Sequence, residues 1–201
     1  MYIEVDGARL FFDTVGAQPA IAGERMAERE TLILMRGGPG FDHTTLRPHS
    51  DRFADTHQVV YLNHRGNGRS SGENGTWTLA QWGRDVKVLC DRLGISKPVV
   101  YGNSFGGMVA MSYATQFPQH PAKLILSSTA AWMHFEITIA LMHERGGERT
   151  HAVAERFWTR PDDAGMQEYI AVCMPLYNEA SMDARDPVGS SHLRSVPTGR
   201  Q

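Results

Sequence analysis

The feature that most restricts the fold of this chain is a succession of short apolar runs separated by helical patterns. The apolar runs cover residues 31–35, 58–62, 98–101 and 123–126. They are as short as ordinary strands, and their apolar residues are nearly continuous, which is typical of strands buried on both faces. Helical patterns lie between the later runs, at residues 79–93 and 105–117. The alternation predicts a parallel sheet whose strands are buried on both faces and joined by crossover helices.

The first residues predict a different arrangement of strands. Apolar and polar side chains alternate on both sides of Asp6-Gly7, a dipeptide that favours a tight hairpin turn. We therefore expect antiparallel strands near residues 2–5 and 10–14. The predicted fold class is α/β, with a mostly parallel sheet that begins with an antiparallel hairpin.

The pattern changes again after Ala131. Amphipathic helical patterns replace the strand patterns, near residues 136–145, 149–159 and 165–173. From residue 179 onward Ser, Asp, Arg, Gly and Pro dominate, and no apolar run follows. We expect an α/β core over residues 1–131, a helical lid over residues 132–178 and a disordered tail over residues 179–201.

Composition excludes several classes of partner. The chain has 201 residues, 41% of them hydrophobic and 21% charged, with a net charge of -2, which does not suit a nucleic-acid partner. No apolar run approaches the roughly 18 residues of a membrane span, and the acidic first residues do not resemble a signal peptide, so we expect a cytoplasmic protein. Cys90 and Cys173 lie in apolar helical patterns and are interpreted as reduced core residues. A cysteine nucleophile is the alternative, but neither residue has a strand-turn-helix setting.

The strongest chemical signal is Gly102-Asn103-Ser104-Phe105-Gly106, which directly follows a predicted strand and opens a predicted helix. This is the setting of a G-x-S-x-G nucleophile elbow, in which small residues on both sides of a strained serine let strand and helix approach. The alternative is a glycine-rich turn with an incidental serine. Because motif, strand and helix coincide, we predict Ser104 as a nucleophile.

A serine nucleophile needs donors for the oxyanion that forms after its attack. One donor would be the N–H of Phe105, at the start of the helix. Arg36-Gly37-Gly38-Pro39-Gly40 follows the apolar run 31–35, and its glycines expose N–H groups. We predict the Gly38 N–H as the second oxyanion donor, and Gly37 and Gly38 as residues that contact the substrate. Taken alone, the segment could equally be a simple turn between strand and helix.

Three segments together resemble the proline iminopeptidase branch of the α/β-hydrolases. They are Arg36-Gly37-Gly38-Pro39-Gly40, Asn63-His64-Arg65-Gly66-Asn67-Gly68-Arg69-Ser70 and Gly102-Asn103-Ser104-Phe105-Gly106-Gly107. Members of that family show H-G-G-P-G, D-x-R-G-x-G-x-S and G-x-S-x-G-G in this order and at similar spacing. The resemblance covers about residues 31–131 and continues more weakly to about residue 178. Arg36 stands in place of the usual histidine and should leave the glycine N–H groups available. Asn63 stands in place of the usual aspartate, which we interpret as a change in stability rather than in catalysis.

The resemblance implies a Ser, Asp, His order, with the acid after a strand beyond the lid and the histidine after the last strand. Neither strand is visible in the sequence, so the closing strands of the fold are expected to be missing. The acids available late in the chain are Asp162, Asp163, Asp183 and Asp186. His192 is the one histidine after the lid and is the candidate base; the alternative is a solvated residue of the tail, because no strand positions it. No metal-ligand spacing and no cofactor fingerprint is present, so neither a metal nor a cofactor is expected.

The leading interpretation is a serine hydrolase of acyl bonds that releases N-terminal proline, or a similar residue, from small peptides. One alternative is an esterase or lactonase acting on small molecules, because fold alone does not fix the substrate. Another is a silent fragment or ligand-binding module that lacks the triad acid and base. The missing strands would also leave the outer edge of the strand at 123–126 unpaired, which favours self-association.

Overall fold

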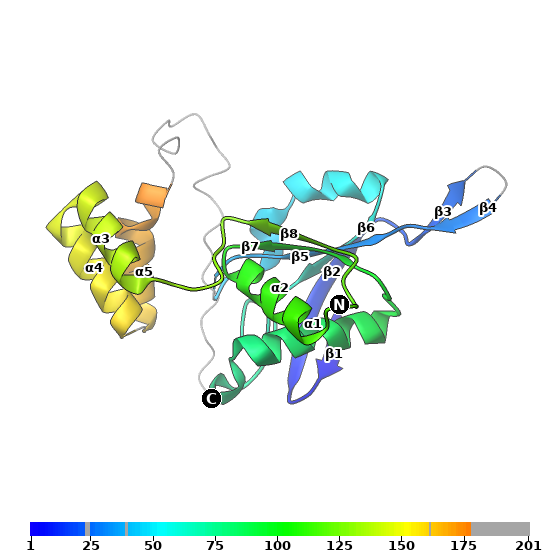
Figure 1. The fold of residues 1–201 in the computed structure, drawn as a ribbon, viewed down its shortest axis with the longest axis horizontal. Coiled ribbons are helices and arrows are strands. Elements are labelled where there is room, and N and C mark those ends of the chain that lie inside the picture. The colour runs from blue at the N-terminus through cyan, green and yellow to red at the C-terminus, as the bar shows by residue number, and fades with distance from the viewer. Residues whose placement is uncertain (23–24, 39, 161, 178–201) are drawn as a thin grey trace. The chain divides into compact units, whose positions relative to one another are not determined.

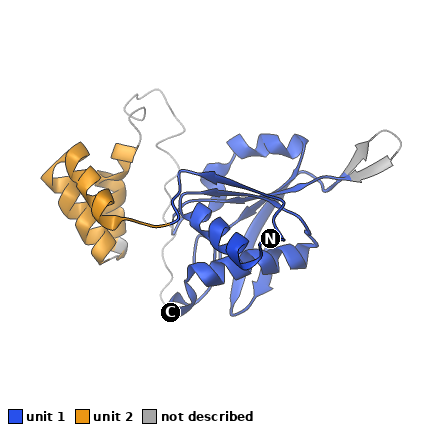
Figure 2. Ribbon diagram, in the orientation of Figure 1, with its two compact units in different colours: residues 1–131, 194–201 blue, residues 132–193 orange. Residues whose placement is uncertain are grey.

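The computed structural model describes residues 1–22, 25–38, 40–160 and 162–177. The strands are β1 (Tyr2–Val5), β2 (Ala8–Val15), β3 (Pro19–Ala22), β4 (Arg25–Glu28), β5 (Thr31–Met35), β6 (Gln58–Leu62), β7 (Val99–Asn103) and β8 (Lys123–Ser127). The α-helices are α1 (Leu79–Leu93), α2 (Phe105–Gln116), α3 (Phe135–Gly146), α4 (Glu148–Thr159) and α5 (Asp163–Val172), and the short 3-10 helices are η1 (His43–Leu46), η2 (His49–Asp55), η3 (Asn74–Thr76) and η4 (Met174–Tyr177). The expected tail lies outside the described residues. The chain divides into two compact units, with the boundary between Ala131 and Trp132 (Figure 2).

The first unit is built on a six-stranded sheet with the order β1-β2-β6-β5-β7-β8 (Figure 1). The β1–β2 and β2–β6 pairs are antiparallel, whereas β5, β6, β7 and β8 run parallel to one another. The turn between β1 and β2 contains Gly7 at φ 66°, a conformation that glycine adopts without strain. The predicted α/β class, with a parallel sheet that begins with an antiparallel hairpin, is confirmed.

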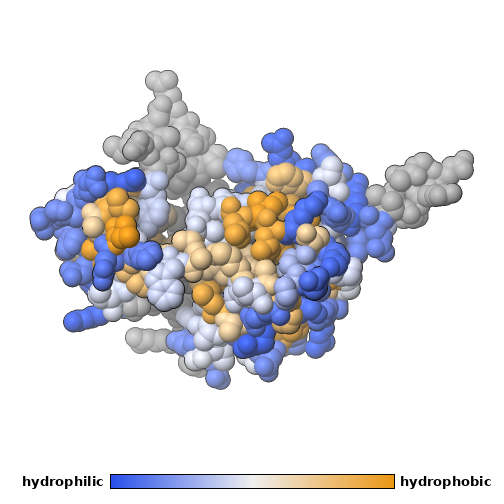
Figure 3. Space-filling view, viewed as in Figure 1, coloured by the Kyte–Doolittle hydropathy of each residue, from blue (hydrophilic) through white to orange (hydrophobic). Residues whose placement is uncertain are grey.

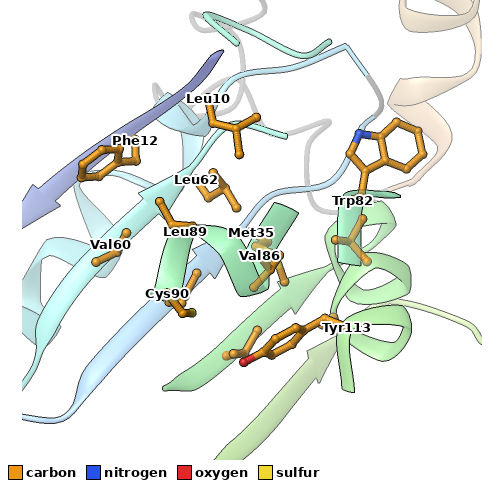
Figure 4. Close-up of a cluster of buried hydrophobic side chains, with 14 of the residues drawn as sticks. Leu10, Phe12, Met35, Val60, Leu62, Trp82, Val86, Leu89, Cys90 and Tyr113 are labelled. Atoms are coloured by element: carbon orange, nitrogen blue, oxygen red, sulfur yellow. The ribbon is translucent and has the colours of Figure 1, made fainter. Parts of the chain in front are cut away.

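Both faces of the sheet carry buried side chains, and the larger core lies beneath α1 and α2. Strand side chains on this face point toward the two helices (Figure 4). The strand residues are Leu10, Phe12, Met35, Val60 and Leu62, and the helical residues are Trp82, Val86, Leu89 and Cys90 of α1 and Tyr113 of α2. The opposite face forms a smaller cluster, in which strand residues pack against Leu46 of η1 and Ala54 of η2. Cys90 is a free, fully buried thiol, as the sequence predicts.

The last strand departs from the prediction that every apolar run is buried on both faces. Leu124, Ile125 and Leu126 of β8 are 37%, 47% and 45% exposed. β8 lies at the end of the sheet, so that only β7 pairs with it among the described residues. An apolar run predicts a strand correctly, but it does not reveal whether elements that would cover that strand are present.

A further difference concerns residues 19–28, for which the sequence predicts no strands. Here β3 and β4 pair as a separate antiparallel ribbon that is not part of the main sheet.

The second unit contains α3, α4, α5 and η4, close to the three helices expected for the lid. Its own core includes Met142, Val153, Phe157 and Tyr169, with Cys173 fully buried as a free thiol. Asp162 caps the N-terminus of α5, where its side chain accepts a hydrogen bond from the Gly165 N–H at 2.5 Å. No helix within the described part of the chain is long and apolar enough to cross a membrane.

Candidate active site

Ser104 is the single residue between β7 and α2. Its backbone has φ 51° and ψ -120°, a conformation that non-glycine residues rarely adopt, and its side chain is exposed. The chain must turn from strand to helix within this one residue, because the strand ends at Asn103 and the helix begins at Phe105. The geometry is that of a nucleophile elbow, which presents a hydroxyl at the carboxyl edge of a parallel sheet.

Three glycines provide the space that the elbow requires. A Cβ atom on Gly102 would lie 2.4 Å from the Gly106 carbonyl oxygen. A Cβ on Gly106 would lie 2.3 Å from the Met35 carbonyl oxygen, and one on Gly107 would lie 2.6 Å from the side chain of Thr129. The sequence G-x-S-x-G-G is therefore explained by contact: α2 can begin against the ends of β5 and β7 only where side chains are absent.

Two residues hold the elbow in place: Ser127, at the end of β8, and Thr129, two residues later. The Ser104 N–H donates to the Ser127 carbonyl oxygen at 2.9 Å. The Thr129 hydroxyl donates to the Ser104 carbonyl oxygen at 2.7 Å, and the Gly107 N–H donates to the same oxygen at 2.9 Å. Thr129 could not be identified from the sequence, because a threonine shortly after a strand matches no motif. The one related sequence signal is Gly107, whose missing side chain leaves the space that Thr129 fills.

The glycine loop after β5 lies directly against the serine. A Cβ atom on Gly37 would be 2.9 Å from the Ser104 Cβ and 3.4 Å from the Ser104 Oγ. Gly37 thus approaches the hydroxyl closely, and the Gly38 N–H belongs to the next peptide along this loop. Phe105 is the first residue of α2, so its N–H is among those that no helical carbonyl can satisfy. The predicted oxyanion residues therefore belong to two segments that approach Ser104.

Arg36 ties the glycine loop to the segment that follows it. Its Nε donates to the Thr45 hydroxyl, and its guanidinium lies 4.6 Å from the centre of the Phe41 ring. Burial lowers the pKa of Arg36, and the nearby Asp42 carboxylate opposes that shift. The Gly40 N–H donates to the Asn67 side chain, which provides a second anchor for the loop.

The arginine loop, residues 63–70, is fixed by a buried ion pair. Arg65 donates from Nε and one terminal nitrogen to the two carboxylate oxygens of Asp85, at 2.8 and 2.7 Å. Another of its contacts is to the Asp6 carbonyl oxygen at 2.6 Å, while its own carbonyl accepts from the Trp82 indole at 3.0 Å. The loop is thereby attached to the hairpin turn and to α1.

Asn63 has a separate partner. Its Oδ1 accepts from the His43 N–H at 3.0 Å and lies 2.8 Å from the His43 Nδ1, while its Nδ2 is buried with no hydrogen-bond partner among the described residues. The side chain of Asn63 thus joins the arginine loop to the start of η1. Burial lowers the pKa of His43, which keeps that ring neutral beside the amide.

His64 packs beneath the elbow. Its ring meets the Phe105 ring edge to face at 5.5 Å, and its Nε2 is buried without a hydrogen-bond partner in the part of the chain that the structure describes. Burial lowers the pKa of His64 to about 4, and a hydrogen bond with the Arg36 backbone opposes that shift. His64 therefore lies between the two segments that would supply the oxyanion donors, and it is neutral at physiological pH.

We expect His64 to make stability depend on pH. Its folded pKa of about 4 lies below the ordinary 6.5, so the unfolded chain binds this proton more readily between those values. The contribution of neutral His64 to the free energy of unfolding is roughly 3 kcal/mol. It is fully present above pH 6.5 and is lost as pH falls toward 4. Urea unfolding at pH 4.5 and pH 7 should show a smaller difference for His64→Gln than for the wild type.

The matched control for this measurement is His49→Gln, which removes an exposed histidine of η2. It should keep the pH dependence of the wild type. An equal loss of stability on acidification in wild type and His64→Gln would contradict the assignment of the effect to His64.

No described histidine makes a hydrogen bond with the Ser104 hydroxyl. His43 is bound to Asn63, His64 is packed on Phe105, and His143 lies 3.0 Å from Glu148 in the second unit. The candidate base His192 lies outside the described residues, as do Asp183 and Asp186.

Of the other late acids, Asp162 is engaged in the capping of α5 and in an ion pair with Arg156 at 3.2 Å, while the side chain of Asp163 is not described. No group of three or more potential metal-ligating side chains forms within the part of the chain that the structure describes.

With this geometry established, the chain can be assigned to a class. It belongs to the alpha/beta hydrolase fold family, whose sequence pattern matches residues 30–170. Among curated proteins it is similar to the proline iminopeptidase of Lactiplantibacillus plantarum, with 34% identity over 113 residues, which are 54% of this chain and 39% of that protein. It is also similar to the proline iminopeptidase PfmaB of Pestalotiopsis fici, with 29% identity over 138 residues, or 67% of this chain and 46% of that one.

A solved structure shows the same fold. The proline iminopeptidase-related protein of Thermus thermophilus has a TM-score of 0.64 and 24% sequence identity, and the match covers 87% of this chain and 56% of that one. The resemblance to the proline iminopeptidase branch is thus confirmed. The chain spans less than half the length of these curated relatives.

Proposed function

We propose that this protein is a serine hydrolase of acyl bonds, with Ser104 as its nucleophile. The observation that carries the proposal is the strained backbone of Ser104, φ 51° and ψ -120°, with an exposed side chain beside Gly37. Strain of this kind persists only where the surrounding contacts enforce it, and it is concentrated at functional sites. Here the glycines, Ser127 and Thr129 enforce it.

In the proposed reaction the Ser104 Oγ attacks the substrate carbonyl carbon while a base takes the hydroxyl proton. The carbonyl oxygen becomes an oxyanion, which the N–H groups of Phe105 and Gly38 would stabilise. Collapse of this intermediate expels the leaving amine or alcohol, which receives the proton, and leaves an acyl-enzyme. Water then attacks the acyl carbon and restores the serine. Loss of one oxyanion donor typically lowers kcat by about 100-fold to 1000-fold.

The base and the acid are the open part of this mechanism. The family order calls for a histidine after the nucleophile, and His192 is our candidate. A chain without a working base would retain only the small rate that oxyanion stabilisation supplies. The first experiment therefore includes His192 beside the nucleophile.

For the substrate we propose a small peptide with N-terminal proline, because the curated relatives reported above are proline iminopeptidases. Small esters and lactones are the second candidates, since one fold supports many acyl substrates. We place the activity in the cytoplasm, consistent with the free thiols of Cys90 and Cys173. No cofactor is required by this chemistry.

The test is steady-state hydrolysis of a proline arylamide and of a short-chain aryl ester by the purified chain. We expect Ser104→Ala to abolish turnover, a loss of at least about 1000-fold, because no other group replaces the attacking oxygen. Ser112→Ala is a matched control, since Ser112 lies on α2 and its hydroxyl donates to the Leu79 carbonyl oxygen at 2.8 Å. It should keep the wild-type rate.

The outcomes separate the candidates. Turnover that is lost in both Ser104→Ala and His192→Ala would support a complete catalytic pair. Cleavage of the ester alone would identify an esterase. A wild-type rate no higher than that of Ser104→Ala would reject the enzyme and leave a silent fragment or a ligand-binding module.

A further inference from the structure

His64 is a polar side chain inside the first unit. Hydrophobic side chains reach the surface of this unit where β8 runs (Figure 3), whereas His64 is only 5% exposed. Its Nε2 has no hydrogen-bond partner among the described residues. A buried polar atom without a partner costs free energy that an apolar side chain of similar size would avoid. Filling space therefore does not account for a histidine at this position, and its other contacts do.

The first of these contacts is with the glycine loop. A hydrogen bond joins the His64 side chain to the backbone of Arg36, the residue that follows β5. Arg36 directly precedes Gly37, whose Cβ position lies 3.4 Å from the Ser104 Oγ. The Arg36 carbonyl oxygen lies 2.7 Å from the Cβ position of Gly106. His64 thus holds the loop where it passes the start of α2.

The second contact is with the first residue of α2. The His64 and Phe105 rings meet edge to face, with their centres 5.5 Å apart. The Phe105 ring meets the Trp82 ring in the same way, at 4.8 Å. The Trp82 indole donates to the carbonyl oxygen of Arg65, the residue after His64. These contacts form a closed circuit through α1, α2 and the arginine loop, so the Phe105 ring cannot move without disturbing His64 or Trp82.

The arginine loop provides a firm support for the His64 ring. Arg65 is fully buried, and its guanidinium donates twice to the Asp85 carboxylate of α1. His64 projects from this fixed backbone onto two segments, one of which carries the Gly38 N–H and the other the Phe105 N–H. The separation of these two N–H groups therefore depends on a ring that is itself held in place.

We propose that His64 is a positioning residue, which holds the glycine loop and the start of α2 at the separation where the Gly38 and Phe105 N–H groups converge on the oxyanion. The inference rests on the proposed hydrolase function, because that function assigns the two N–H groups to the oxyanion. His64 acts through these segments and does not touch the substrate. A displacement of about 1 Å in such a site lowers the rate by about 100-fold.

The test compares two replacements of His64 that have nearly the same length. The side chain of His64→Met has no N–H donor, whereas that of His64→Gln carries an amide donor. With a short-chain aryl ester at pH 7, His64→Met should lower kcat by about 100-fold and change KM by less than about threefold, because the oxyanion forms only after the substrate has bound. His64→Gln should recover at least about tenfold of that loss.

Leu89→Ala is the matched control for lost packing. Leu89 of α1 is fully buried and belongs to the same core cluster as Trp82. Its truncation leaves a cavity and should lower the urea midpoint of unfolding. It should nevertheless keep the wild-type kcat, when all rates are measured at a temperature where circular dichroism shows every variant to be folded.

A second measurement does not need turnover. In two-dimensional amide NMR spectra, the Gly38 and Phe105 signals should move in His64→Met and return toward their wild-type positions in His64→Gln. A wild type no faster than Ser104→Ala would reject the proposed function. The amide spectra would then still decide whether His64 positions these two N–H groups.

Several results would overturn the proposal. They are a wild-type kcat in folded His64→Met, an equal loss of kcat in His64→Met and His64→Gln, and Gly38 and Phe105 amide signals that stay unchanged in His64→Met.

Discussion

Gly106→Ala should destabilise the first unit by about 3 kcal/mol or more, although alanine is the better helix former. The added Cβ would lie 2.3 Å from the Met35 carbonyl oxygen and 2.7 Å from the Arg36 carbonyl oxygen. Both atoms belong to the backbone at the end of β5, so neither can rotate away as a side chain would. Relief requires α2 to move away from the sheet, and this movement would also displace Ser104.

The measurement is the free energy of unfolding in urea for Gly106→Ala beside Gly75→Ala. A Cβ on Gly75 would meet nothing within 4 Å, so this control should lie within about 0.5 kcal/mol of the wild type. If the two variants were equally stable, the close approach of α2 to β5 would not be the reason for glycine at position 106.

Asp85→Ala should cost about 3–5 kcal/mol, because it leaves a buried guanidinium without its counter-charge. The side chains of Arg65 and Asp85 are 1% and 4% exposed. The pair is joined by two hydrogen bonds, and the Gln81 amide also donates to Asp85 at 2.9 Å. A guanidinium is not deprotonated in a folded protein, so the variant cannot avoid the cost by losing the Arg65 proton.

Helix α1 itself offers the control for this measurement. Lys87 and Asp91 form an ion pair at 2.6 Å, with side chains that are 25% and 55% exposed. Asp91→Ala should cost less than about 1 kcal/mol, since solvent screens an exposed pair. Urea unfolding of both variants tests the difference. A similar loss in the two would mean that the Arg65 charge is compensated by other groups, such as the Asp6 carbonyl that it already contacts.

Much of this architecture follows from the sequence because local and global signals agree. The continuous apolar runs specify strands that the sheet buries, and the helical pattern at residues 79–93 coincides with α1. Ser104 could be predicted for the same reason, since its motif falls between an apolar run and a helix. The contacts of Thr129 and the partner of Asn63 could not be predicted, because they join residues that are distant in sequence and share no periodic pattern.

The exposure of β8 marks another limit of sequence reasoning. A continuous apolar run indicates that its residues prefer a buried position, so the sequence predicts that Leu124 to Leu126 are buried. Whether that preference is satisfied depends on covering elements that the described chain does not provide. The triad acid and base could not be predicted for a related reason. The family places each of them after a strand, and no strand pattern follows the lid in this sequence.

The hydrogen bonds from Ser104 and Thr129 give the edge of the sheet a mechanical role. The Ser127 carbonyl, at the end of β8, accepts from the Ser104 N–H, and Thr129, two residues later, donates to the Ser104 carbonyl oxygen. Any strain that reaches β8 from outside is therefore transmitted to Ser104 through these two hydrogen bonds. Thermodynamic reciprocity then applies. If a partner that binds this edge changes the affinity of a ligand at Ser104, binding of that ligand changes the affinity of the partner by the same factor.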